Sequence, residues 1–397
     1  MYFCQNPFTM NIFLATVTSF FFGFLMTPVL ILILKKINFT ETPGGRRIHA
    51  GKIPSMGGIA IVCATFVGLF AWLSFDQIVE TRYFLVALAI MFSVGLRDDL
   101  IELTAVQKLI GQSIPAFFVI VMADIRISSL YGFMGVYEIP YLISVGITFF
   151  AILALTNSFN LIDGADGLAG SLSLVTLSIL GFWFYTAGMI SYSLISFTLV
   201  GGILAFLVFN WHPAKIFMGD TGSLSVGFCL TVLVILFIDK SGLMAPWEGL
   251  KLNAPFSAGL AFLIVPIYDT VRIFIKRTKN GKSPLKPDKS HVHHFLLRMG
   301  LQHDQVSMVL VVVKLTFISI VFFGYALNDH ILLPVLVLIA TFLGIWMDKK
   351  TLQKVKDNCK KGPLISEMNY NRKKRKQPKR KPSIEKNIFS DNKINMN

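Results

Sequence analysis

Charged side chains are scarce in this chain. Of its 397 residues, 15% are Asp, Glu, Lys or Arg and 54% are hydrophobic, whereas a soluble domain carries about 25% charged residues. This balance argues against a soluble enzyme and indicates a protein that crosses a membrane repeatedly. The four cysteines have no paired or metal-like spacing, which argues against a disulfide framework and a zinc site. The sequence also has no internal repeat and no Walker-type phosphate loop.

Long apolar runs account for most of the chain. They lie near residues 11–34, 56–75, 82–96, 107–123, 139–156, 168–188, 191–209, 222–238, 256–276, 305–327 and 331–347. Each approaches the roughly 20 residues that a helix needs to cross the hydrocarbon core. We therefore predict an all-α polytopic membrane protein with about eleven transmembrane helices in residues 1–348. Ten helices are the alternative, because the run at 82–96 is short. We expect no cleavable signal peptide, since the first run is too long for one.

Lysine and arginine are distributed unevenly over the connecting loops. With eleven spans, 32 of the 37 Lys and Arg residues fall on the side that carries the C-terminus, and 4 fall on the other. The positive-inside rule places the basic loops and the C-terminus in the cytoplasm. Residues 349–397 lose the apolar pattern and are predicted to form a basic, disordered tail. We interpret that tail as a topology signal or an anionic-lipid contact rather than a nucleic-acid site.

Five carboxylates lie on this cytoplasmic face, each at the end of an apolar run: Asp98, Asp99, Asp163, Asp166 and Asp220. A lone charge beside hydrocarbon is costly, so such groups usually hold a cation or move protons. Neighbours i and i+1 on a helix point in different directions. One of Asp98 and Asp99 can therefore face a metal while the other faces a substrate proton. The alternative is a solvated helix end paired with Arg97.

The densest polar segment follows the fifth run. Asn160, Asp163 and Asp166 recur at a spacing of three, which suits one face of a helical turn. The glycines at 164 and 167 let a ligand come close to the backbone. This polar density between two spans favours a binding site.

Asp220 lies just before the eighth run. We expect Thr221 or Ser223 to cap the helix that begins there. The free N–H groups of a helix start, next to a carboxylate, suit a bound diphosphate. An Asp at a helix start is also a common N-cap, so the motif alone leaves both interpretations open.

Cations gather in the first and fifth cytoplasmic loops. The candidates for phosphate contact in the first loop are Arg46, Arg47, His49 and Lys52, with a simple positive-inside anchor as the alternative. In the fifth loop, His291, His293 and His294 lie among several lysines, which favours anion binding over a tetrahedral zinc site.

Three charged residues fall inside apolar runs. Asp269 and Arg272, at i and i+3, are predicted to pair, either as structural support or as part of a site. For Lys314, snorkelling or contact with a lipid phosphate is as good an interpretation as catalysis.

Carboxylates at the centre and cations at the rim of one membrane face are suited to phosphoryl transfer with Mg²⁺. The setting favours one lipid substrate and one cytosolic nucleotide derivative. A second hypothesis is an ion-coupled transporter whose carboxylates relay protons. Transporter sites usually lie near the bilayer midplane between internal repeats, which this sequence does not show.

The motifs also resemble a known family. They are Arg97-Asp98-Asp99, the segment 160–167 (NLIDGADG), the segment 217–223 (FMGDTGS) and His291-Val292-His293-His294. Over roughly residues 10–345 they resemble the polyprenyl-phosphate N-acetylhexosamine-1-phosphate transferases of glycosyltransferase family 4. The His-x-His-His form is similar to the bacterial undecaprenyl-phosphate N-acetylglucosaminyl-1-phosphate transferase branch. The phospho-MurNAc-pentapeptide transferases typically have three consecutive histidines, so Val292 argues against that alternative. Ser55 stands where relatives often carry Arg.

The resemblance implies an activity and a set of roles. UDP-N-acetylhexosamine and undecaprenyl phosphate would give undecaprenyl-diphospho-sugar and UMP, at the cytoplasmic side of a bacterial inner membrane. Asn160 and Asp220 would hold Mg²⁺, with Mn²⁺ as an alternative, and Asp98 would act as base with Asp99 assisting the metal site. Asp163 and Asp166 would face the nucleoside. The three histidines would bind the diphosphate or sugar phosphate. Membrane lipids and a second copy of the chain are further expected partners.

Overall fold

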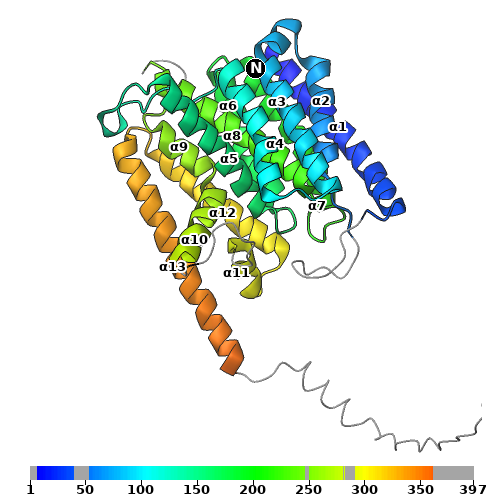
Figure 1. Cartoon of the computed structure of the whole chain (residues 1–397), viewed down its shortest axis with the longest axis vertical. Helices are drawn as coiled ribbons and strands as arrows, with labels where there is room; N and C mark the ends of the chain where they lie inside the picture. The colour runs from blue at the N-terminus through cyan, green and yellow to red at the C-terminus, as the bar shows by residue number, and fades with distance from the viewer. Residues whose placement is uncertain (1–6, 40–52, 246–249, 280, 282–290, 361–397) are drawn as a thin grey trace, which may run out of the picture. The chain divides into compact units, whose positions relative to one another are not determined.

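The computed structural model of the chain describes residues 7–39, 53–245, 250–279, 281 and 291–360. The chain divides into two units, residues 1–348 and 349–397. The regular elements of the described residues are helical (Figure 1): α1 Pro7–Lys36, α2 Gly58–Trp72, α3 Phe75–Leu100, α4 Ala105–Met122, the short 3₁₀ helix η1 Phe133–Gly135, α5 Tyr141–Ile162, α6 Leu168–Thr186, α7 Ile190–Asn210, α8 Gly219–Leu243, α9 Pro255–Phe262, α10 Ile264–Lys279, α11 Val292–Arg298, α12 His303–Phe323 and α13 Asp329–Lys360.

The predicted class, an all-α polytopic membrane protein, is confirmed. Among the described residues, nine helices are long and apolar enough to cross a membrane, and α9 with α10 makes a tenth if the bent pair is one span. The remaining predicted run contains α2, a shorter apolar helix of 15 residues. Each of the eleven predicted runs therefore contains a helix, while the number long enough to span is nine or ten.

Two helices differ from the predicted runs for identifiable reasons. The run at 82–96 was expected to be short, but α3 has 26 residues because it begins at Phe75. Ser74 and Gln77 form a capping box there, and the polar residues of the first turns hid the helix start from the apolar count. The ninth run is broken near Leu263, where α9 and α10 meet at 81°.

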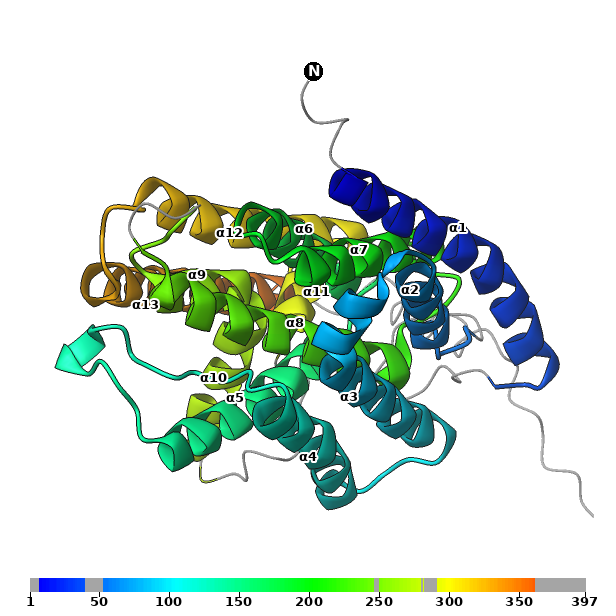
Figure 2. The same cartoon turned by 90° about the horizontal axis from the view of Figure 1, so that it is seen from above.

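α8 lies at the centre of the first unit. All of its membrane window is buried inside the protein, and it contacts α2, α3, α5, α6 and α9 (Figure 2). Glycines allow the closest approaches at its first turns. A Cβ at Gly58 would lie 2.0 Å from the nitrogen of Gly222, and one at Gly95 would lie 2.7 Å from the carbonyl oxygen of Asp220. The start of α8 is therefore held directly against α2 and α3.

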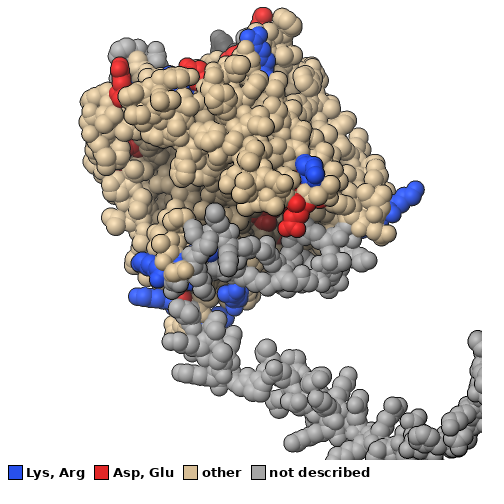
Figure 3. All heavy atoms as spheres, viewed as in Figure 1, with Lys and Arg blue, Asp and Glu red and all other residues tan. Residues whose placement is uncertain are grey.

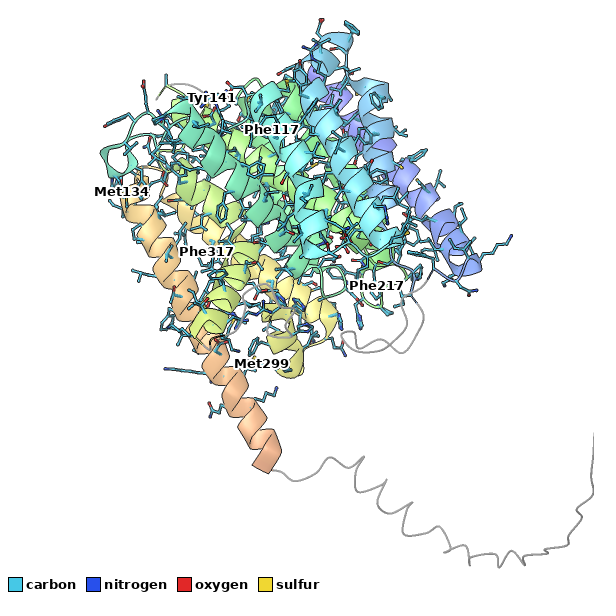
Figure 4. All side chains as sticks on the ribbon, in the orientation of Figure 1. Phe117, Met134, Tyr141, Phe217, Met299 and Phe317 are labelled. Atoms are coloured by element: carbon cyan, nitrogen blue, oxygen red, sulfur yellow. The ribbon has the colours of Figure 1, made fainter. Side chains whose placement is uncertain are left out.

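Charged side chains are found mainly at the two ends of the first unit. The view in Figure 3 has a broad middle zone almost free of charge, as expected for a surface that faces hydrocarbon. At one end α3 and α5 finish and α4 and α8 begin, and we call this the motif end. Phe217 and Met299 lie there, while Tyr141 at the start of α5 lies at the opposite end (Figure 4).

Two sets of predicted residues lie outside the described residues. They are the first-loop cations Arg46, Arg47, His49 and Lys52, and the basic stretch of the tail at 372–381. Their predicted contacts stay predictions.

Candidate active site

A side chain from another helix caps the first turn of α8. Asp99, in the last turn of α3, accepts hydrogen bonds from the backbone N–H groups of Asp220 and Thr221, both at 2.8 Å. It also accepts one from the Thr221 hydroxyl at 2.5 Å. A helix start has free N–H groups and a partial positive charge, so a carboxylate is stabilised there. Gly219 has a φ of +73°, and a Cβ on it would lie 2.7 Å from the Asp99 carboxylate, so this turn requires glycine.

The expectation that Thr221 or Ser223 caps α8 is therefore wrong. The helix begins at Gly219, and its N-cap residue Met218 has no side-chain cap. Thr221 lies inside the first turn and donates to Asp99, while the Ser223 hydroxyl donates to the Gly219 carbonyl at 2.9 Å. The apolar count placed the helix start too late because its first residues are polar.

Lys108 joins Asp98 to Asp220. Its ammonium nitrogen lies 2.8 Å from Oδ2 of Asp98 and 2.8 Å from Oδ1 of Asp220. The other oxygen of Asp98 accepts the N–H of Leu103 at 2.8 Å. The side chain of Asp98 is 4% exposed and that of Asp220 is 36% exposed. Asp98 is thus a buried carboxylate with both oxygens engaged, and Asp220 is the more exposed of the two.

Asn160, near the end of α5, completes this group. Its amide nitrogen donates to Oδ1 of Asp220 at 2.5 Å and to the Ser223 hydroxyl at 2.7 Å. Asn160 and Asp220 were predicted from the sequence to act together, and the structure brings their side chains into contact. We call Asp98, Asp99, Lys108, Asn160 and Asp220 the carboxylate centre.

Sequence reasoning missed Lys108 as a site residue and counted it only as a loop cation. It lies in the first turn of α4, after the Thr104 capping box. The available signal was a lysine at the start of a span close to two adjacent carboxylates, because a cation so placed usually neutralises them.

The expectation that Asn160, Asp163 and Asp166 share one helical face is also wrong. α5 ends at Ile162, and Asp163 is its C-cap residue with ψ 66°. Asp163 is half-buried. The helix stops because the glycine-rich segment that follows turns sharply toward α6, with Gly167 at φ +74°.

Asp166 is 2% exposed and its carboxylate is occupied by protein groups. Oδ2 lies 2.7 Å from Nδ1 of His212 and accepts the N–H of Ala214 at 3.2 Å. Its backbone N–H donates to Nδ1 of His303 at 3.2 Å, and the imidazole rings of His212 and His303 stack with centroids 5.3 Å apart. Asp166 therefore ties the loop before α8 and the start of α12 to the α5–α6 turn.

The histidine motif is anchored to α10. His291, the N-cap residue of α11, has Nδ1 2.8 Å from Oδ2 of Asp269, and the N–H of Val292 donates to Oδ1 at 2.8 Å. The predicted Asp269–Arg272 pair is confirmed at 3.5 Å, and Arg272 also bonds Asp348 at 2.7 Å. Asp269 thus holds the His291 ring and the start of α11 in place.

The same motif lies against the α5–α6 turn. A Cβ on Gly164 would lie 2.2 Å from Nε2 of His293, so the imidazole ring fits over a position where no side chain is present. His293 stacks on His291, with centroids 5.6 Å apart, and its ring centroid is 4.3 Å from that of His294. Burial lowers the pKa of His293 well below its ordinary range, and the neighbouring histidines lower it further. His293 is therefore neutral near pH 7.

The donor atoms fit a hard divalent cation. Among the residues that the structure describes, no three His, Cys, Asp or Glu side chains are arranged as a metal site. Mg²⁺ needs fewer protein ligands, because it typically takes one or two carboxylates and completes its shell with water and substrate phosphates. Asp98 and Asp220 already share one cation, Lys108, and turning the amide of Asn160 over presents its oxygen to the same place.

Comparison with known proteins agrees with this chemistry. The model of glycosyl transferase family 4 matches residues 81–238. Over 320 residues the chain is 32% identical to a protein of Bacillus subtilis (strain 168) named probable undecaprenyl-phosphate N-acetylglucosaminyl 1-phosphate transferase, covering 77% of this chain and 83% of that protein. The chain belongs to glycosyl transferase family 4.

Other relatives cover similar shares of the chain. A protein of Yersinia pestis, named undecaprenyl-phosphate alpha-N-acetylglucosaminyl 1-phosphate transferase, is 29% identical over 349 residues, which is 85% of this chain and 90% of the relative. A protein of the same name from Escherichia coli (strain K12) is 30% identical over 288 residues, covering 70% and 74%. The family 4 match at 81–238 includes the whole carboxylate centre, so this part of the chain carries the features of a membrane-embedded transferase.

Proposed function

We propose that this family 4 enzyme transfers N-acetylglucosamine-1-phosphate, or a closely related N-acetylhexosamine-1-phosphate, from a UDP-sugar to undecaprenyl phosphate. An oxygen of the lipid phosphate attacks the phosphorus that carries the sugar. The bond from that phosphorus to the bridging oxygen breaks, and UMP leaves. The observation that carries the proposal is the shared contact of Asp98 and Asp220 with one cation at the motif end.

Bound Mg²⁺ would neutralise charge on the diphosphate and polarise the phosphoryl group. We propose that Asp220 and Asn160 hold it, since Asp220 is the more exposed carboxylate and Asn160 contacts it directly. Asp99 acts on this site indirectly by fixing the first turn of α8, on which Asp220 is carried.

For the lipid phosphate we propose Asp98 as proton acceptor and Lys108 as its electrostatic partner. The buried Asp98 is held by Lys108 and by the N–H of Leu103, so its position is fixed before any ligand binds. A single displacement needs two phosphates aligned with little covalent help from the protein, so fixed charges are the main contribution.

For the sugar nucleotide we propose the surface between the α5–α6 turn and α11. Asp163 lies one turn beyond Asn160, and Gly164 lies under His293. His291, His293 and His294 are proposed to contact the diphosphate or sugar phosphate, together with the first-loop cations Arg46, Arg47, His49 and Lys52. Asp166 is proposed to keep the nucleoside side of this surface in shape through His212 rather than by reaching the ligand itself.

The donor is cytosolic, so the motif end must face the cytoplasm. The excess of Lys and Arg on the loops of that end supports this orientation. We therefore propose a multi-pass protein of the bacterial inner membrane, with its site on the cytoplasmic side.

The test uses purified protein in detergent with labelled UDP-N-acetylglucosamine and undecaprenyl phosphate. We expect a Mg²⁺-dependent lipid product and an equal amount of UMP, both abolished in Asp220→Asn with normal insertion. Competition with UDP-N-acetylgalactosamine and UDP-MurNAc-pentapeptide identifies the donor. Absence of product with every donor would overturn the proposal, and solute flux in proteoliposomes without covalent change would favour the transporter hypothesis.

A further inference from the structure

A reciprocal amide pair lies directly behind the carboxylate centre. The amide nitrogen of Gln112 in α4 donates to Oδ1 of Asn157 in α5 at 3.3 Å, and the amide nitrogen of Asn157 donates back to Oε1 of Gln112 at 2.6 Å. The second hydrogen of the Asn157 amide goes to the Leu153 carbonyl at 2.8 Å. Gln112 is fully buried.

The positions of Gln112 and Asn157 on their helices connect the pair to the site. Gln112 follows Lys108 by four residues and Asn157 precedes Asn160 by three, so each amide lies on the same helix face as a site residue. By helical rise, Gln112 lies about 6 Å further from the motif end than Lys108, and Asn157 lies about 4.5 Å further than Asn160, so each amide is roughly one helical turn away. Lys108 and Asn160 reach the same oxygen of Asp220, at 2.8 and 2.5 Å. The spacing of α4 and α5 therefore decides whether both can do so.

Placing two amides between the membrane-spanning helices α4 and α5 is costly unless both are satisfied. Here the pair satisfies itself, so it specifies one relative position of the two helices instead of a sliding apolar contact. Since its polar groups are engaged with each other, the pair does not present a free binding group to substrate. The pair must therefore affect the site through Lys108 and Asn160, one helical turn away.

We propose that Gln112 and Asn157 are positioning residues that set the separation of Lys108 and Asn160 across Asp220. The inference rests on the proposed function for its activity readout. It assigns to the pair an effect on the chemical step and on Mg²⁺ affinity, rather than on stability alone.

The experiment compares Gln112→Leu, Gln112→Asn, Asn157→Gln and the double swap Gln112→Asn/Asn157→Gln. We expect each single variant to lower kcat at least about tenfold, because displacements near 1 Å can cost up to about a hundredfold. The KM for the UDP-sugar should change less than about twofold, and the Mg²⁺ concentration for half-maximal activity should rise. The double swap keeps the pair and its total side-chain length, so we expect it to restore kcat to within about threefold of wild type.

Ser113→Ala is the matched control. Ser113 is the next residue of α4, and its hydroxyl donates to the carbonyl of Leu109 in its own helix, so the kcat of Ser113→Ala should stay within about twofold of wild type. A lower unfolding temperature with unchanged kcat in Gln112→Leu would overturn the proposal and leave a packing role. Loss of kcat that the swap does not restore would also overturn it.

A failure of the proposed function has a different sign: the wild-type protein itself would form no UMP. Calorimetric titration of MgCl₂ into the purified proteins then reports on the pair without turnover. Weaker Mg²⁺ binding in Gln112→Leu that the double swap restores supports the positioning role. Equal binding in all variants, or binding that the swap does not restore, contradicts it.

Discussion

The Asp99 carboxylate receives the backbone N–H of Asp220 at 2.8 Å, so one carboxylate of the site holds the residue that carries another. This relationship separates the two adjacent aspartates of α3 by function. Asp98 contacts the Lys108 ammonium, whereas Asp99 accepts the backbone N–H groups at the start of α8.

Asp99→Ala removes the acceptor of two backbone N–H groups and one hydroxyl. We expect a loss of about 1–2 kcal/mol in the free energy of unfolding, as for other lost helix caps, together with a fall in kcat because Asp220 is displaced. Thermal unfolding in detergent and the UMP assay measure the two effects. Asp76→Ala, at the exposed opposite end of α3, is the control and should match wild type. An Asp99→Ala protein with wild-type stability would contradict the cap.

Lys108→Met removes the cation that Asp98 and Asp220 share. We expect a loss of roughly 3–5 kcal/mol in stability, since a partner of a largely buried carboxylate is removed, and at least about a hundredfold fall in kcat. Excess Mg²⁺ should recover part of the lost stability, because it can neutralise the same carboxylates. Lys36→Met at the exposed end of α1 serves as control. Normal unfolding temperature and turnover in Lys108→Met would show that the contact contributes nothing.

Asp269→Asn weakens the support of the histidine motif. We expect the KM for the UDP-sugar to rise, because Asp269 fixes both the His291 ring and the N–H of Val292. Asp348→Asn is a sharp control, since Asp348 bonds Arg272, which also pairs with Asp269. Steady-state kinetics distinguish the two variants. An equal rise of KM in both variants would mean that Asp269 acts on UDP-sugar binding through Arg272 rather than through His291.

Gly164→Ala tests the contact between the α5–α6 turn and His293. The added methyl group would meet Nε2 at 2.2 Å, so the ring must move. We expect at least about tenfold lower turnover, as for other small displacements of a site, with little change in unfolding temperature because Gly164 is exposed. Gly146→Ala, at an exposed position of α5 where an added Cβ meets nothing within 4 Å, gives the background effect of such a change. Wild-type kinetics in Gly164→Ala would remove His293 from the site.

Acid should destabilise the protein through His293. Its folded-state pKa lies below the ordinary 6.5 because the ring is buried and faces His291, His294 and His303. The unfolded chain therefore binds this proton more readily, and the stability that the neutral ring provides is present above pH 6.5 and is lost as pH falls toward the folded pKa. We expect the unfolding temperature to drop below pH 6.5 in wild type and to drop less in His293→Gln. Parallel pH profiles of the two proteins would contradict this.

The sequence predicted the helices well and their ends poorly. Apolar runs identify buried segments regardless of context, so each run contains a helix. The starts of α3 and α8 were predicted too late, because polar residues occupy their first turns. The capping of α8 by Asp99 could not be predicted, since it depends on how two helices distant in the chain cross.

The site shows the same division between what local sequence indicates and what depends on packing. The family resemblance implied that Asn160 and Asp220 share a metal site, and their side chains are in contact. Lys108 was counted only as a loop cation, and Gln112 is found only through the packing of α4 against α5. For Asp166 the structure adds partners that the sequence did not indicate. Its motif favoured a ligand contact, yet burial and His212 occupy its carboxylate. The assigned roles of the individual site residues stay predictions.

The full enclosure of α8 has a consequence for biogenesis. A helix this apolar can enter the bilayer alone, but in the folded protein its membrane window is surrounded by protein rather than lipid. It must therefore leave the lipid phase as its neighbours close around it. Because Asp220 is carried on α8 while Asp98, Lys108 and Asn160 come from helices synthesised earlier, a chain that stops before residue 219 can insert several spans and still have no centre. Competence for catalysis should arise late and abruptly during synthesis.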